Sequence, residues 1–187
     1  MSELSVGSLS GLAANSYVVD IASGSSLDLS NATDLPASAL PAGSILQVVS
    51  ATKTDQFATT ATGVVDVPGL SVSITPSSAS SKVLVFFNLM LGNSVTATDV
   101  HIKLLRDATW IAKNTDAGTQ TTTFMLTGVN YVPYHPSLTH LDSPATTSSV
   151  TYKIQMERFS GTGTVNRRGD NAGNGAVSSI TVMEVAG

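Results

Sequence analysis

The sequence predicts an all-β protein, an antiparallel β-sandwich that follows an extended N-terminal arm. From Ile45 to the C-terminus, apolar residues recur with a period of two, and no helical period of any length is found. Clusters of Gly, Pro, Ser and Thr separate these runs at the spacing of sandwich turns. Charged residues make up 12% of the chain, about half the usual ~25%, because Ser, Thr, Gly and Ala take their places.

The chain divides into an arm, residues 1–44, and a sandwich domain, residues 45–187, because its composition shifts near Pro41. In the arm, short apolar clusters are separated by Gly and Ser, and the segment ends in DLPASALPAG. It is too apolar for a solvated linker and too interrupted to pack by itself, so we expect it to lie extended on another surface. A disordered leader, or a strand added to its own domain, remains an alternative. The residues expected to dock are Leu4, Val6, Leu9, Tyr17 and Val19.

The first strands of the sandwich are predicted from ILQVVS, which begins the domain, and from GLSVSIT. In the second run, Leu70, Val72 and Ile74 alternate with Ser and Thr, as one buried and one exposed strand face require. TPSSASS is the turn that follows. Further along, Asp107 and Ala108 in KLLRDATW predict a tight antiparallel hairpin.

Residues 81–91, SKVLVFFNLML, predict a strand that is apolar on both faces. Every second residue from Val83 to Leu91 is apolar, and the opposite face carries Leu84, Phe86 and Met90. An ordinary surface strand alternates apolar with polar residues. Two explanations remain open: a second sheet and a covering loop bury this face, or another copy of the chain does. In the second case Leu84, Phe86 and Met90 are candidate contacts between copies.

The C-terminal part continues with TTTFMLTG, NYVPY and LTHLD, a Pro/Ser/Thr turn, and the regularly alternating VTYKIQMER. A long Gly/Asn loop then leads to the last strand, SSITVMEV. We expect about eight to ten strands in total.

Charge and composition exclude several classes of function. The net charge is −4 with a pI near 5.1, which disfavours nucleic-acid binding because few phosphates would be neutralised. Cysteine is absent, so there are no disulfides, thiolate nucleophiles or sulfur-ligated metals. We also expect no signal peptide and no membrane span, since no basic start and no sufficiently long apolar run is found.

No residue pattern predicts catalysis, a metal or a cofactor. His140 lies two residues before Asp142, which is a weak metal pair, and GSLSG lacks the flanking strand and helix of a nucleophile elbow. The aspartates are explained by turn and loop positions. We therefore expect a protein that is not an enzyme.

A glycan-binding surface is a further hypothesis. Tyr131, Tyr134 and His135, with the loops 113–120 and 160–175, would present aromatic and amide groups to a host polysaccharide. The alternative is that the tyrosines pack at the sandwich edge and the loops are solvated.

Five stretches carry a family resemblance over residues 45–187: ILQVVSATKTD, GLSVSITPSSASSKVLV, KLLRDATWIA, LDSPATTSSVTYKIQ and SITVMEVAG. In this order they resemble the β-sandwich domain of virion proteins from tailed phages that infect cyanobacteria. In that group the domain occurs at the tips of tail fibres and tailspikes, and as a trimeric cement protein on the outer capsid. The resemblance implies a jelly-roll-like sandwich and a homotrimer, with Leu84, Phe86 and Met90 as candidate trimer contacts.

Two virion roles follow from the resemblance. A fibre or spike needs a long shaft, whereas only forty-four residues precede the sandwich here, so we expect a capsid cement or decoration protein of a cyanophage. Its partner would be the major capsid protein, and its location the outer capsid surface of the virion. The alternative is a tail fibre or tailspike tip that recognises host cell-surface glycans.

Overall fold

The structure is a computed structural model, and it describes residues 40–95, 98–114, 122–126, 132–170 and 173–187. Throughout these ranges the regular elements are β-strands, which confirms the all-β prediction. The docking residues of the predicted arm (Leu4, Val6, Leu9, Tyr17 and Val19) lie outside the described residues, so the arm remains a prediction.

The described residues form twelve strands, two more than the upper end of the expected range. The additional ones are short, since four strands have only three residues, too few for an alternation to be recognised. The strands are β1 (Ile45–Lys53), β2 (Phe57–Thr59), β3 (Val64–Ile74), β4 (Lys82–Asn88), β5 (Leu91–Asn93), β6 (Asp99–Arg106), β7 (Thr109–Ile111), β8 (Thr123–Leu126), β9 (Ser137–Asp142), β10 (Val150–Arg158), β11 (Gly163–Val165) and β12 (Ser178–Val185).

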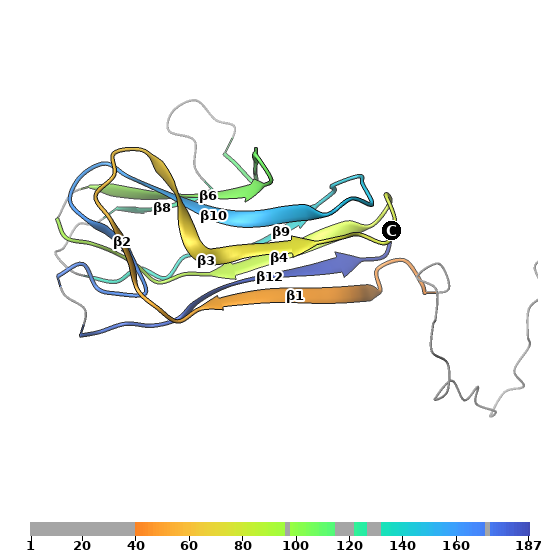
Figure 1. The fold of residues 1–187 in the computed structure, drawn as a ribbon, viewed down its shortest axis with the longest axis horizontal. Helices are drawn as coiled ribbons and strands as arrows, with labels where there is room; N and C mark the ends of the chain where they lie inside the picture. Colours follow the sequence, from red (N-terminus) through yellow and green to blue (C-terminus); the bar gives the residue numbers. More distant parts are fainter. Residues whose placement is uncertain (1–39, 96–97, 115–121, 127–131, 171–172) are drawn as a thin grey trace, which may run out of the picture. The chain divides into compact units, whose positions relative to one another are not determined.

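The strands form two main antiparallel sheets packed face to face (Figure 1). One sheet has the order β1-β12-β4-β9, and the other has the order β3-β10-β6-β7 with β8 paired to β6. The long strands β1, β3, β4 and β6 alternate between the two sheets, and so do β9, β10 and β12, which is the connectivity of a jelly roll. A third, small sheet, β2-β11-β5, lies at one end.

The core lies between the two main sheets and follows the predicted alternation. Leu70, Val72 and Ile74 of β3 are at most 5% exposed, while the serines between them are exposed. On β10, every second residue from Val150 to Met156 is buried in the same way. Period-two alternation therefore predicted the core face of both strands.

The predicted hairpin at Asp107 and Ala108 is also confirmed. Arg106 of β6 pairs with Thr109 of β7, so the connecting loop has two residues. Asp107 has a left-handed backbone (φ 52°), a conformation that aspartate tolerates better than most residues. Its side chain and its backbone N–H both bond to Thr151 on β10, which ties the hairpin to the neighbouring strand.

The strand predicted at 81–91 is shorter than expected, because β4 ends at Asn88. Val83, Val85 and Phe87 fill the core, whereas Leu84 and Phe86 on the other face are only partly buried. Beyond the strand the alternation is lost, and Leu89, Met90 and Leu91 are all buried. Met90 is 4% exposed within the single chain, so it offers almost no surface to another copy.

Part of the loop predicted at 160–175, residues 161–169, is largely built into the fold. Its strand β11 is buried and pairs with β2 on one side and β5 on the other. Asn166, in a left-handed conformation (φ 61°), follows it and is 1% exposed. Gly169 is required by close backbone packing here, because a Cβ at this position would lie 1.8 Å from the carbonyl oxygen of Asn93.

Candidate functional site

The candidate site is the outer face of the sheet β1-β12-β4-β9, which we call the uncharged sheet face. The strand register places Val48, Met183, Leu84 and Leu141 directly opposite one another, in a row that crosses all four strands. Opposed residues in antiparallel strands point to the same side of the sheet. Val48 and Leu141, at the two edges, are 56% and 47% exposed, and Met183 and Leu84 are partly buried.

The row on one side of this apolar row holds Ile45, Val185 and Lys82, and the rows on the other side are uncharged and mostly polar. The next row along the strands holds Ser50, Thr181, Phe86 and Thr139, and the one after it holds Thr52, Ser179, Asn88 and Ser137. Among the outward-facing residues described on these strands, Lys82 is the one charged side chain, and it is the first residue of β4. The face therefore combines an apolar row with hydroxyl groups and offers almost no charge.

The outer face of the opposite sheet has the contrary character. Lys153 of β10 bonds to Asp66 of β3 at 3.0 Å, and Lys103 of β6 bonds to Glu157 of β10 at 2.8 Å. The Lys103 ammonium also lies 4.8 Å from the centre of the Trp110 ring. Charged side chains that pair on a half-exposed sheet are typical of a surface that stays in water. The two outer faces of the sandwich therefore differ in kind.

The structure places the candidate trimer contacts in two environments. Leu84 and Phe86 lie on the uncharged sheet face, as the alternation of residues 81–91 predicted. Met90 does not, since its backbone N–H donates to Ser178 Oγ and its carbonyl accepts from the Asn166 N–H inside the fold. Sequence reasoning missed Val48, Met183 and Leu141. They could have been recognised because their strands also carry apolar residues on both faces, as the neighbouring pairs Val48-Val49 and Val182-Met183 show.

The candidate glycan-binding residues are only partly covered by the structure. Tyr134 is 46% exposed and His135 is also exposed. The backbone of Tyr134 bonds in both directions to Leu91, at 2.7 and 2.9 Å. Tyr131 lies outside the described residues. Both described side chains are accessible to solvent, and the glycan-binding surface remains a prediction.

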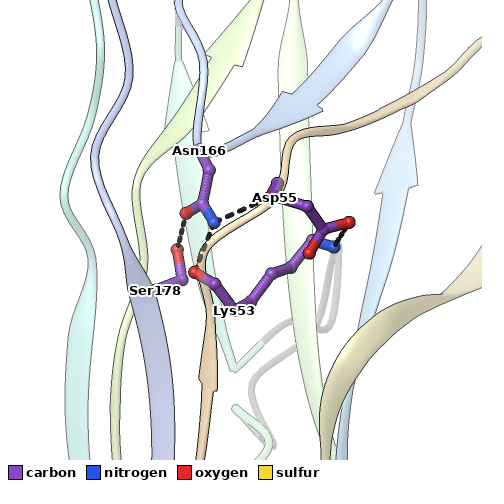
Figure 2. A network of polar contacts seen from close by, with 4 residues as sticks. All are labelled: Lys53, Asp55, Asn166 and Ser178. Carbon is purple, nitrogen blue, oxygen red and sulfur yellow. Dashed lines mark hydrogen bonds and ion pairs between the residues drawn. The ribbon is translucent and has the colours of Figure 1, made fainter.

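A buried polar network fastens the end of the sandwich near the small sheet (Figure 2). Asn166 Nδ2 donates to the backbone carbonyls of Lys53, at 2.7 Å, and Asp55, at 3.0 Å, while Asn166 Oδ1 accepts from Ser178 Oγ at 2.6 Å. The Lys53 ammonium, on a side chain 1% exposed, bonds to Asp55 at 2.8 Å. These contacts join the end of β1 and the start of β12 to the residue that follows β11, so the network stabilises the fold.

A second network lies at the opposite end, beside the C-terminus. Glu184 is 1% exposed, and its carboxylate accepts from Gln47 Nε2 at 2.6 Å and from the Ser77 N–H at 2.7 Å. Burial raises the pKa of Glu184, but hydrogen bonds from Ser77 and Gln47 outweigh it and hold that pKa below its usual value. Ser77 and Ser81 also line a half-open cavity of about 660 Å³.

Asp142, Arg106 and Tyr152 form a group of titratable side chains that joins the two sheets. Asp142 of β9 accepts from Arg106 and from the Tyr152 hydroxyl, both at 2.7 Å. Burial and the bond to Asp142 raise the pKa of Tyr152 far above its usual value. Asp142 is thus engaged across the two sheets, which explains its burial.

Within the described ranges, no three His, Cys, Asp or Glu side chains are grouped closely enough to hold a metal ion. The same part of the chain contains no helix that is long and apolar enough to cross a membrane.

The comparisons with known proteins give similarity of structure only. No family model matches the chain, and no curated protein matches it. Among solved structures, it is similar to the VP2 subviral particle of infectious bursal disease virus, with 14% identity, a TM-score of 0.41, and coverage of 75% of this chain and 38% of that chain. A mutant VP2 of the same virus in T=1 particles has 11% identity, a TM-score of 0.41, and coverage of 75% and 36%. The chain spans less than half the length of these structures, and the matches assign neither a family nor a function to it.

Proposed function

We propose that the chain is a structural virion protein without enzymatic activity: a homotrimeric decoration, or cement, protein of a cyanophage that binds the outer capsid surface and stabilises the shell. The observation that carries the proposal is the uncharged sheet face. A row of four apolar side chains crosses a sheet whose outward positions hold almost no charge. Such a face suits a protein that functions in an assembly, because exposed apolar patches mark interaction sites.

The predicted arm supplies the contact with the capsid. Residues 1–44 contain Glu3, Asp20, Asp28 and Asp34 but no Lys or Arg, so the remaining nine Asp and Glu are balanced by nine Lys and Arg in residues 45–187. The net charge of −4 therefore belongs to the arm. An arm with apolar clusters and acidic residues is complementary to a groove with an apolar floor and a basic rim. We expect the major capsid protein to present such a groove.

Shell stabilisation would follow from mass action. A ligand that binds only the assembled state stabilises it by about 2.7 kcal/mol per site at a hundredfold excess over Kd. Three arms on one trimer raise the local concentration for one another, which increases the overall affinity about 10² to 10⁴-fold. The sandwich then serves as a compact knob that holds the three arms together.

The jelly-roll connectivity agrees with this role without selecting it, since jelly rolls occur in both viral capsid and lectin domains. The number of copies per virion distinguishes the cement protein from the alternative, a glycan-binding fibre tip. Hundreds of copies per virion are expected for a capsid protein, and a few tens or fewer for a tail protein. Quantitative mass spectrometry of purified virions makes this measurement.

Deletion of residues 1–40 tests the arm. We expect the shortened chain to fold and to form the same oligomer, but to lose binding to capsids that lack the protein, because the docking residues are gone. Cosedimentation with such capsids measures binding. A matched pair of variants refines the test: replacing Leu4, Val6 and Leu9 by Ser should weaken binding at least tenfold, while replacing Ser5, Ser8 and Ser10 by Ala should not. Full occupancy by the shortened chain would refute the docking role.

A further inference from the structure

We infer that the uncharged sheet face is the surface through which three copies of this chain meet, with their β1-β12-β4-β9 sheets turned towards the threefold axis. This inference rests on the homotrimer of the proposed function. It replaces the three candidate contacts predicted from residues 81–91 with a surface built from four strands. Its central residues are Met183 and Leu84, and its edges are Val48 and Leu141.

Charge favours a second copy as the occupant. Symmetry brings equivalent residues of identical chains near one another around an axis, so charged groups on such a face would repel their own copies. On the opposite sheet, Lys103 and Lys153 with their partners Glu157 and Asp66 would meet this difficulty. The uncharged sheet face largely avoids it, because it has one charged residue, Lys82, which is the first residue of β4 and lies one row from Leu84.

The position of the apolar row favours burial of the whole face rather than of one edge. Val48 on edge strand β1 is 56% exposed and Leu141 on edge strand β9 is 47% exposed. An occupant that covered one edge strand would leave the other residue in water. The serine and threonine hydroxyls in the adjacent rows can bond either to a facing copy or to trapped water, as is usual in protein interfaces.

The test uses the full chain and two double variants. Val48→Lys with Leu141→Lys places charges on two exposed positions of the uncharged sheet face. Val64→Lys with Ser73→Lys is the matched control, since both residues are exposed on the outer face of β3 in the opposite sheet. Sedimentation velocity at micromolar concentration should give a trimer for the wild type and the control, and one third of that mass for the first variant. Circular dichroism verifies that both variants are folded.

A second measurement avoids destabilising substitutions. Because the chain has no cysteine, Met183→Cys introduces a single thiol near the proposed axis. Mild oxidation should link this variant into covalent dimers, while Ser73→Cys on the opposite sheet should stay monomeric on a denaturing gel. Equal cross-linking of the two variants would overturn the inference.

The remaining outcomes separate this inference from the proposed function. A monomeric wild type, or a trimeric Val48→Lys/Leu141→Lys variant, overturns the inference whether or not the protein binds capsids. A monomeric wild type that associates after deletion of residues 1–40 would show that the arm, not a second copy, occupies the face. A trimer that dissociates as expected but binds no capsid leaves the inference standing and refutes the cement role.

Discussion

At the scale of single residues, the two buried polar networks are features that local sequence patterns missed. Glu184 lies in the alternating strand SSITVMEV at a position that faces the core, where an apolar residue is expected. It is tolerated because Gln47 and Ser77, 137 and 107 residues away in the chain, satisfy both carboxylate oxygens. Such distant partners cannot be recognised from local spacing.

The depressed pKa of Glu184 predicts a dependence of stability on pH. A carboxylate with a lowered folded-state pKa contributes stability above its usual value of 4.5, and this contribution is lost as pH falls through the folded-state pKa. Glu184→Gln should lower the free energy of unfolding at pH 7 by about 1–3 kcal/mol, because an amide cannot accept at both positions. Urea unfolding between pH 3 and 7 should show the variant and wild type converging towards low pH. Glu157→Gln, on a partly exposed pair, is the control; parallel pH profiles would contradict the assignment.

Asn166 is the residue on which the other network depends. Asn166→Ala removes three hydrogen bonds of the network and places alanine at a left-handed φ of 61°, so we expect a loss of at least about 2 kcal/mol. Asn174→Ala, at an exposed position of the same segment, should leave stability unchanged within about 0.5 kcal/mol. Thermal unfolding compares the two. Equal midpoints would show that the network contributes no stability.

At the scale of elements, the hairpin between β6 and β7 depends on Asp107. Asp107→Ala should destabilise the protein by about 1–2 kcal/mol, because it loses the bond to the Thr151 N–H and strains the left-handed backbone. Asp107→Asn keeps an acceptor and tolerates this φ, so it should be close to neutral. Chemical denaturation of both variants measures the difference, and an alanine variant as stable as the asparagine variant would refute it.

The predictability of the strands depended on their length. β3 and β10 were identified with the correct core faces, since they have 11 and 9 residues and alternate over several periods. β2, β5 and β11 have three residues each and are determined by pairing with one another rather than by their own pattern. Met90 was assigned to the wrong environment for a related reason, because the alternation of β4 stops at Asn88 while the apolar sequence continues.

At the scale of the whole molecule, the sequence predicted the sandwich but only part of the candidate site. Leu84 and Phe86 were identified because one strand showed an apolar second face. Val48 and Leu141 join the same row only through the register of four strands, and they lie far apart in the chain. The difference in charge between the two outer faces could not be predicted for the same reason. It depends on which strands share a sheet, and local sequence does not give that assignment.

The pairing of β1 with the final strand also has a mechanical consequence. Gly43 N–H donates to the Ala186 carbonyl and Ala186 N–H donates to the Ser44 carbonyl, both at 2.8 Å, so the start of β1 lies beside the end of β12 (Figure 1). Tension applied between these two points would unzip the strands one pair of bonds after another, which needs little force. Tension applied from the start of β1 to the far end of β12 would instead shear all eight paired residues of β1 together. A load applied through the start of β1 is therefore resisted best when the opposing force acts at the start of β12, at the far end of the sheet.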